Sequence, residues 1–253
     1  NPISGSGKHN IGKTELEKYF PKDIYKIEVE YSNYKTHAIT LTQNAIVNNP
    51  DCIVACGGDG TINEVASCLI NTKIKLGIIP VGSGNGLASN LSIPKALEKA
   101  TEIILKGKTQ FIDVGKVNGH YFFSNVGVGI DALIIKKYES YSKRTLMSYV
   151  RASIASSIQY KPMQTILSFN NQIINTKAFI LFISNSNEMG YGMSLTPKAS
   201  LNDGKLDLVV VSKINFIDKL ILGMRVVSNK IEKFKKAQHT LIENINIEIP
   251  EKK

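Results

Sequence analysis

The stretch that most constrains the fold runs from Cys52 to Ile70 and reads CIVACGGDGTINEVASCLI. Its first residues are short, apolar and rich in β-formers, which predicts a buried strand. The glycines that follow allow a tight turn and leave room for a ligand. Thr61 and Glu64 have the spacing of a capping box, so we expect a helix from about Thr61 to Leu69. A strand, a glycine turn and a helix N-terminus together favour phosphate binding.

Asp59 lies within this glycine turn. A carboxylate beside a phosphate site has two natural uses: it can hold a phosphate-bound Mg²⁺, or it can accept the proton of an attacking hydroxyl. The alternative without a function is a plain tight turn with Asp as a turn residue. The coincidence of three glycines, an acid and a helix start in one strand–helix unit favours the functional interpretation.

The composition is that of a globular protein with an excess of positive charge. The chain has 253 residues, of which 43% are hydrophobic, and its longest apolar runs are far shorter than the ~20 residues of a membrane span. The net charge of +10 suits an anionic partner, such as nucleic acid, an acidic membrane or a phosphorylated substrate. Aromatic residues do not alternate with the basic ones, so we expect no nucleic-acid partner.

The three cysteines, Cys52, Cys56 and Cys68, flank the glycine turn. Their odd number and their placement in an expected strand and helix predict reduced core thiols. The four histidines are scattered without the spacing of metal ligands, which argues against a metal–thiolate site.

Strands and helices alternate over the first 110 residues, which predicts a mostly parallel sheet. We expect helices at Thr14–Phe20, Thr36–Asn48, from Leu87 onward and at Pro94–Lys106, and strands at Tyr25–Tyr31 and Leu76–Val81. A second glycine loop, Gly82 to Gly86, follows the last of these strands. Because ligands bind beyond the carboxyl ends of parallel strands, the two loops could converge on one nucleotide, with Ser83 and Asn85 as hydrogen-bond partners.

After residue 110 the chain is rich in strands, which predicts a second, mainly antiparallel domain. We place the domains at 1–110 and 111–253. The expected elements are a hairpin over 111–126 about Asn118-Gly119, a helical stretch Leu133–Tyr160, strands at Thr165–Phe169, Ile173–Ser184, Leu206–Val211 and Asn244–Ile249, and a helix at Phe216–Ser228.

Residues Gly7 to Thr14 match the P-loop pattern G-x4-G-K-T letter for letter. A P-loop follows directly on a buried strand, whereas Asn1 to Ser6 contains Pro, Gly and two Ser and has no apolar run. The context therefore argues against a P-loop.

Six motifs occur in a fixed order, and together they span nearly the whole chain. They are Asn1-Pro-x-Ser-Gly5, Gly57–Glu64, Pro80–Asn85, Ile112–Asn118, Asn125–Asp131 and Pro197–Asp207. The ordered set resembles the diacylglycerol kinase and sphingosine kinase catalytic-domain family, although Gly-Gly-Asp-Gly alone is shared with NAD kinases and phosphofructokinases. The resemblance implies an N-terminal α/β nucleotide-binding domain with a mostly parallel sheet, a C-terminal antiparallel β-sandwich, and an active site between them.

The resemblance also implies roles for individual residues. Asp59 would lie at the phosphates and Asp113 near the interdomain cleft, and we take both as candidate catalytic residues. A turn at Asn202-Asp203-Gly204 matches a structural Mg²⁺ site, with Asp203 and the backbone carbonyls of Ser200 and Lys205 as ligands. Including the loop residues inferred above, the expected ATP contacts are Ser32 (a weaker match), Gly57, Gly58, Asp59, Gly60, Thr61, Ile62, Asn63, Glu64, Ser83 and Asn85.

Two departures from the family pattern bear on the acceptor and on the catalytic base. Gly86 stands where many bacterial members have Asp. The Asp-Gly-Glu motif that the family places after the strand ending near Pro250 is not in this chain, which looks clipped at both ends.

The sequence is thus interpreted as an ATP- and Mg²⁺-dependent kinase that phosphorylates the hydroxyl of a membrane lipid, most simply diacylglycerol or a sphingoid-type alcohol. We expect it in the cytoplasm, peripherally bound to an anionic membrane surface. A homodimer is a possible oligomeric state that the sequence does not decide. Two alternatives remain: a soluble-substrate kinase of the NAD kinase type, and a lipid-binding protein with a degenerate kinase site.

Overall fold

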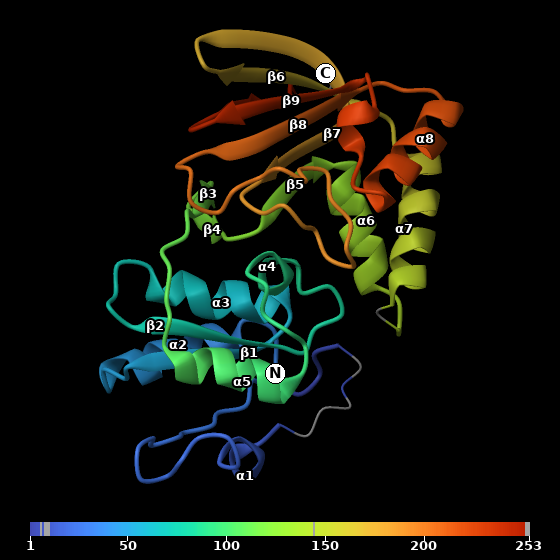
Figure 1. The fold of residues 1–253 in the computed structure, drawn as a ribbon. Coiled ribbons are helices and arrows are strands. Elements are labelled where there is room, and N and C mark those ends of the chain that lie inside the picture. Colours follow the sequence, from blue (N-terminus) through green and yellow to red (C-terminus); the bar gives the residue numbers. More distant parts are fainter. Residues whose placement is uncertain (6, 8–10, 144, 251–253) are drawn as a thin grey trace. The chain divides into compact units, whose positions relative to one another are not determined.

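The structure, a computed structural model, describes residues 1–5, 7, 11–143 and 145–250 (Figure 1). The chain divides into two compact units, Asn1–Phe111 and Ile112–Lys253. Residues 8–10 of the P-loop-like motif lie outside the described residues. Residues 1–5, which precede the motif, form turns and bends rather than the strand that a P-loop requires.

The first unit is an α/β unit built on two parallel strands. β1 pairs with β2 in register from Cys52 opposite Lys75 to Gly57 opposite Pro80, which confirms the expected parallel pairing. Its elements in order are α1 (Lys13–Leu16), α2 (His37–Val47), β1 (Cys52–Gly57), α3 (Asp59–Leu69), β2 (Lys75–Pro80), α4 (Gly86–Asn90) and α5 (Leu97–Lys106).

Helix α3 supplies much of the core of this unit. Ile62, Val65, Ala66 and Leu69 are buried, and their spacing of three and four residues places them on one face of the helix. The buried positions of β2 are consecutive, from Gly77 to Pro80, as in a strand covered on both faces. This packing fixes the start of α3 at the carboxyl end of β1.

The predicted strand Tyr25–Tyr31 is wrong. These residues form no ladder with any described strand, and both Tyr25 and Tyr31 are exposed. An alternating pattern makes a strand only where a neighbouring edge accepts its hydrogen bonds, and β1 pairs only with β2 in the described chain. The predicted helix Thr14–Phe20 is shorter, because α1 gives way to turns after Leu16.

The second unit is built on a six-stranded antiparallel sheet. The strand order is β10-β6-β7-β8-β9, and β5 pairs with the far end of β7. Its elements in order are β3 (Gly115–Val117), β4 (His120–Phe122), β5 (Asn125–Gly129), α6 (Ile130–Glu139), α7 (Leu146–Gln159), β6 (Met163–Phe169), β7 (Gln172–Ser184), β8 (Leu206–Ser212), α8 (Phe216–Val227), η1 (Ile231–Lys233), β9 (Ala237–Ile242) and β10 (Asn246–Glu248).

Both predicted hairpin turns are present. Asn118 and Gly119 have φ values of 47° and 87°, and Asn170 and Asn171 have values of 48° and 58°. Two consecutive positive φ angles are typical of the type I′ turn, whose twist matches that of the strands it joins. The first hairpin is shorter than expected, because after His120–Phe122 the chain turns away and β5 pairs with β7 instead.

The sheet is apolar on both faces, which explains the dense run of valines in β8. Val209 and Val211 pack on one side with Leu222 of α8, and Leu208 and Val210 pack on the other. Helices α6 and α8 therefore cover one face (Figure 1), while residues such as Phe122 of β4 contribute to the other core. This arrangement agrees with the expected antiparallel sandwich.

The predicted helical stretch Leu133–Tyr160 is two helices. α6 ends at Glu139, and α7 begins at Leu146 after Thr145, whose side chain accepts a hydrogen bond from the Ser148 N–H at 3.2 Å. The N-cap signal of Thr145 was missed. β9 was also missed, because its sequence AQHTLI lacks a clear alternation. Within the described residues, no helix has both the length and the apolar character needed to cross a bilayer.

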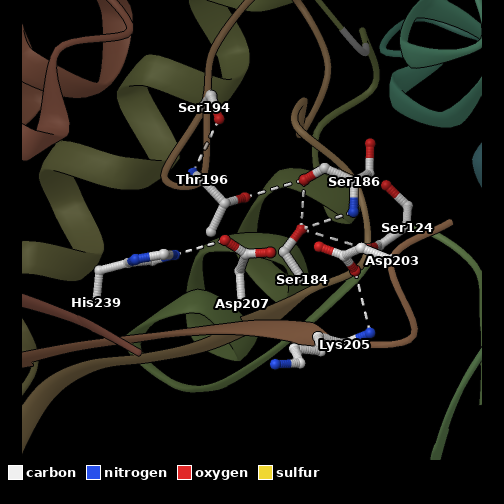
Figure 2. Close-up of polar contacts among 9 residues, drawn as sticks. All are labelled: Ser124, Ser184, Ser186, Ser194, Thr196, Asp203, Lys205, Asp207 and His239. Atoms are coloured by element: carbon white, nitrogen blue, oxygen red, sulfur yellow. Dashed lines mark hydrogen bonds and ion pairs between the residues drawn. The ribbon is translucent and has the colours of Figure 1, made fainter. Parts of the chain in front are cut away.

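A buried polar cluster lies where β7 leaves the sheet (Figure 2). The Ser184 hydroxyl donates to the Ser186 carbonyl at 2.6 Å, and the Thr196 hydroxyl donates to the same carbonyl at 2.9 Å. Asp207, buried on the neighbouring strand opposite Ser184, lies 2.5 Å from Nε2 of His239 on β9. Hydrogen bonds of this kind satisfy backbone groups that the sheet no longer pairs.

The Asp207–His239 pair gives a stability prediction. In His239→Ala the buried carboxylate loses its side-chain partner, so the free energy of unfolding should fall by roughly 1–3 kcal/mol. Lys236→Ala removes an ion pair with Asp218 whose lysine is half exposed, and should cost less than about 1 kcal/mol. Urea unfolding of both variants tests this, and equal losses would show that burial of Asp207 is unimportant.

Candidate functional site

The glycine loops that follow β1 and β2 touch each other. Gly57 lies opposite Pro80, so both loops leave the same edge of the sheet. A Cβ atom added to Gly82 would lie 2.4 Å from the Cα atom of Gly58, and one added to Gly58 would lie 3.1 Å from the Cα atom of Gly82. A side chain on either residue would force the backbones apart. The predicted meeting of the two loops is confirmed.

The Asn1–Gly5 loop joins them at the same edge. The Asn1 side-chain amide donates to Oγ1 of Thr61 at 3.0 Å. Gly5 has a φ of +64°, and a Cβ there would lie 2.2 Å from the Val81 carbonyl oxygen. Three sequence motifs that are far apart along the chain therefore pack into one structure.

The Asp59 carboxylate ties the first glycine loop to the second. Its Oδ2 accepts a hydrogen bond from the Gly86 N–H at 3.1 Å, and its Oδ1 accepts one from the Leu87 N–H at 3.2 Å. Gly86 and Leu87 open α4, so the acid at the start of α3 satisfies the free donors at the start of α4. A carboxylate oxygen has two acceptor sites, which leaves capacity on each oxygen for a cation or a proton.

The predicted capping box of α3 is wrong. The helix begins at Asp59, two residues earlier than expected, with Gly58 as N-cap and no side-chain cap. Thr61 is buried over Gly57, where a Cβ would lie 2.4 Å from the Cβ atom of Thr61. Because the packing of α3 against the strands uses Thr61 as a core contact, it cannot serve as a cap.

The start of α3 leaves room for an anion. The first N–H groups of a helix have no partner within the helix, and the helix dipole favours negative charge there. A Cβ added to Gly60, in this first turn, would meet no atom within 4 Å. Open space over a helix N-terminus between two fixed glycine loops fits the phosphates of a nucleotide.

The other residues predicted to contact ATP have different surroundings. Asn85 is buried in a left-handed conformation, and its side-chain amide donates to the Gly82 carbonyl at 2.6 Å, so it shapes the loop from inside. Ile62 lies in the core of the unit. Ser83 is partly exposed on the loop, and Asn63 is partly exposed on α3.

Glu64 holds the segment that contains Ser32. Its Oε1 accepts a hydrogen bond from the Thr36 N–H at 3.1 Å, and Thr36 has a left-handed backbone with φ of 69°. Ser32, four residues earlier, is half-buried. The structure therefore brings the segment that contains Ser32 beside α3, with Glu64 as its support. Contact of Ser32 with a nucleotide stays a prediction.

In the second unit, Asp113 holds the predicted metal turn. Its Oδ2 accepts a hydrogen bond from the Gly204 N–H at 2.7 Å, and its N–H donates to the Leu201 carbonyl at 2.6 Å. Its own carbonyl accepts from the buried side-chain amide of Asn185 at 2.6 Å. These bonds bring together Asp113 and the turn, two predicted features separated by about ninety residues.

The turn itself has oxygen donors that suit Mg²⁺. Oδ1 of Asp203 accepts from the Lys205 N–H at 3.0 Å, and the Ser200 hydroxyl donates to Oδ1 of Asn202 at 2.9 Å. One carboxylate with backbone carbonyls from Ser200 and Lys205 is an all-oxygen set of the kind Mg²⁺ takes. Among the residues that the structure describes, no cluster of three or more His, Cys, Asp or Glu residues forms a metal site.

A cavity of about 450 Å³ in the second unit was not predicted. It lies among β5, α6, α7 and β7, and its size is in the range of ligand sites. The walls combine apolar side chains with a few polar ones. The lining residues include Val126, Gly127, Asp131, Ile135, Tyr149 and Phe182.

Asp131 is the notable group in this cavity. Burial raises its pKa to about 6, and burial also raises the pKa of Tyr149 beside it. A Cβ on Gly127 would lie 2.1 Å from Oδ2 of Asp131, so the glycine makes the room that the carboxyl occupies. The signal was present in the motif Gly127-Val-Gly-Ile-Asp131, which places an acid where a strand passes into a helix.

Both halves of the chain match known family models. Residues 1–117 match the diacylglycerol kinase catalytic domain, and residues 124–243 match the YegS C-terminal NAD kinase beta sandwich-like domain. A diacylglycerol kinase of Bacillus subtilis (strain 168) is 30% identical over 221 residues, which cover 82% of this chain and 72% of that protein. One from Staphylococcus aureus (strain MRSA252) is 30% identical over 220 residues, covering 82% and 69%. The chain therefore belongs to the diacylglycerol kinase family.

Solved structures have the same fold. A crystal structure from Bacillus anthracis str. Sterne, described as a diacylglycerol kinase, matches with a TM-score of 0.70 at 22% identity, covering 99% of this chain and 84% of that one. A second structure from the same organism matches with a TM-score of 0.78, also at 22% identity, covering 99% and 83%. The two-domain α/β plus antiparallel architecture is thus that of known proteins.

Gly60 provides a test of the anion site that leaves the fold intact. Gly60→Ala adds a methyl group into open space in the first turn of α3 and restricts the unfolded chain, so stability should not fall. The same methyl group would fill the space for the phosphates, so we expect ATP affinity to fall at least about tenfold. Calorimetric titration and thermal unfolding give the two quantities.

Gly223→Ala is the matched control, because Gly223 is also helical and an added Cβ there also meets no atom within 4 Å. Gly223→Ala should likewise keep or raise the free energy of unfolding, and it should bind ATP with wild-type affinity. Wild-type ATP binding by Gly60→Ala would contradict the placement of the phosphates.

Asp131 gives a prediction about pH. Its pKa is raised from the ordinary 3.8 to about 6, so the folded protein keeps a proton that the unfolded chain releases, and stability should fall as pH rises from about 4 to 6. Asp131→Asn lacks this loss, so near neutral pH it should be more stable than wild type by on the order of 3 kcal/mol. Urea unfolding at about pH 4 and about pH 7.5 tests this. If the variant and wild type differ in free energy of unfolding by the same amount at both pH values, the Asp131 carboxyl does not titrate between them as stated.

Proposed function

We propose that this protein transfers the γ-phosphoryl group of ATP to the hydroxyl of a membrane lipid, either diacylglycerol or a sphingoid-type alcohol. The observation that carries the proposal is the contact between Gly58 and Gly82, which joins two glycine loops at the carboxyl ends of parallel strands. Membership of the diacylglycerol kinase family supports a lipid acceptor.

The donor half of the reaction is assigned to the first unit. The free N–H groups at the start of α3 and the space over Gly60 would bind the phosphates. Asp59 would act there in one of two ways, by holding the metal that accompanies the phosphates or by accepting the proton of the attacking hydroxyl. Because its hydrogen bonds to α4 already fix the carboxylate, it needs little reorganisation during transfer.

Magnesium, when bound, would neutralise charge on the phosphates. A second ion would fit the turn at Asp203, where the protein offers one carboxylate and backbone carbonyls. Asp113 acts on that turn through its hydrogen bond to Gly204, so we assign it the role of positioning the turn. The catalytic role that the resemblance implied for Asp113 stays a prediction.

The acceptor half is assigned to the cavity of the second unit. Its apolar side chains, including Val126, Ile135 and Phe182, suit hydrocarbon, while Asp131 and Tyr149 are polar groups that can fix a hydroxyl. The half-buried Asp131 carboxyl lines this cavity, where it could exchange hydrogen bonds with such a group.

A soluble acceptor of the NAD kinase type is the second candidate. The observation in its favour is the C-terminal family model, which is described as NAD kinase beta sandwich-like. A water-soluble acceptor would need no membrane and would make the reaction insensitive to lipid dispersion, which separates the two candidates.

The proposal predicts the effect of Asp59→Asn on phosphoryl transfer to diacylglycerol in detergent micelles. Asn keeps an oxygen that accepts one of the two backbone hydrogen bonds, loses the charge and turns an amide NH2 toward the other N–H, so kcat should fall by at least ~10²-fold and the melting temperature should fall modestly. Asp59→Ala removes both bonds and should also lower the melting temperature. Near wild-type kcat in Asp59→Asn would reduce Asp59 to a structural link between α3 and α4.

A further inference from the structure

One face of α8 carries large apolar side chains in an exposed position. Phe216, Ile217, Leu220, Met224 and Val227 are 55–66% exposed. Their separations of one, four, eight and eleven residues from the first place them on one side of the helix. Leu222, on the opposite side, packs in the core. Surface helices normally turn a polar side toward solvent, whereas α8 has apolar residues on its buried side and on its exposed side.

Helix α7 extends the same kind of surface. Met147, Ile154 and Ile158 are 58–69% exposed, and their spacing of seven and four residues aligns them along one side of the helix. The Lys219 ammonium of α8 donates a hydrogen bond to the Ser157 carbonyl of α7, so the two helices approach each other at this point (Figure 1). We call these eight apolar residues, five on α8 and three on α7, the α7–α8 face.

Most charges near this face are positive, although the exposed Glu232 follows α8. Between Glu139 and Glu188 the chain contains no acidic residue, while it contains five Lys or Arg. The acid of α8, Asp218, completes a capping box with Asn215 and pairs with Lys236 at 2.5 Å. Exposed basic side chains on or beside the two helices include Arg151, Lys161, Lys213 and Lys230, and Arg225 is half-buried.

We propose that the α7–α8 face docks the protein on an anionic lipid bilayer, with its apolar side chains in the acyl boundary and the basic residues at the head groups. Apolar side chains bordered by Lys and Arg are the pattern of helices that lie in a membrane interface. A second copy of the chain is a poorer partner, since a two-fold contact would bring the same positive charges together. The inference rests on the proposed function, because a lipid acceptor must be reached at a membrane.

Co-sedimentation of the full-length protein with vesicles tests the proposal. Wild type should bind vesicles of phosphatidylglycerol and phosphatidylcholine, less so at high salt, and bind pure phosphatidylcholine weakly. Leu220→Gln/Met224→Gln should weaken binding to the anionic vesicles at least about tenfold, since two large apolar side chains no longer leave water. Both residues are exposed, so the melting temperature should not change.

Two controls make the result specific. Val47→Gln removes an apolar side chain that is even more exposed, 84% at the end of α2, and should bind as wild type. Arg151→Gln should reduce binding to anionic vesicles and lessen its salt dependence. Unchanged vesicle binding by Leu220→Gln/Met224→Gln would overturn the proposal. The proposal would also be overturned if wild type formed a concentration-dependent dimer, did not bind vesicles, and lost the dimer in Leu220→Gln/Met224→Gln.

The docking surface and the proposed activity can fail separately. Transfer to diacylglycerol dispersed in detergent does not require docking on a bilayer, so Leu220→Gln/Met224→Gln should keep wild-type turnover there and lose it on vesicles. If vesicle binding is weakened by Leu220→Gln/Met224→Gln but no phosphoryl transfer is seen in any protein, the docking surface is supported and the kinase assignment is refuted. Full turnover of the variant on vesicles would refute the docking surface alone.

Discussion

The two hydrogen bonds from the start of α4 to the Asp59 carboxylate organise the first unit. Asp59 belongs to the loop after β1, and its donors, Gly86 and Leu87, belong to the loop after β2. The contact between Gly58 and Gly82 lies at the same edge of the sheet, where the parallel pairing of β1 and β2 brings the two loops together. One acid thus fixes the geometry of the site and supplies its charge, which is why its structural and chemical roles must be separated by experiment.

How much of this could be predicted depends on how local the determinant is. The strand–turn–helix order and the type I′ turns at Asn118-Gly119 and Asn170-Asn171 follow from short-range rules, and both turns are present. The convergence of the glycine loops followed from parallel pairing. The partner of Asp59 did not, because Gly86 is 27 residues away and nothing local marks it. The capping box failed for the same reason, since packing on the sheet outweighed a local preference.

The second unit shows a related limit. The buried Asp207–His239 pair and the Asp113–Gly204 bond join residues that are distant in sequence, and each residue alone reads as an ordinary polar side chain. Asp131 is different, because its glycine-rich motif was visible in the sequence while its partial burial beside a cavity was not. The strand predicted at Tyr25–Tyr31 had the right alternation but no edge to pair with. Burial and pairing, in short, are properties of the whole chain.

Taken together, two glycine loops that meet beside an open helix N-terminus, a cavity lined by the half-buried Asp131, and exposed apolar side chains on α7 and α8 suit the proposed kinase that works on a membrane lipid. The most direct test is transfer from radiolabelled ATP by the full-length protein, offered a membrane lipid extract and NAD in the same reaction. The account predicts label in the organic-soluble lipid fraction and none in the NAD fraction. Label in the NAD fraction alone, or no transfer to either acceptor, would contradict it.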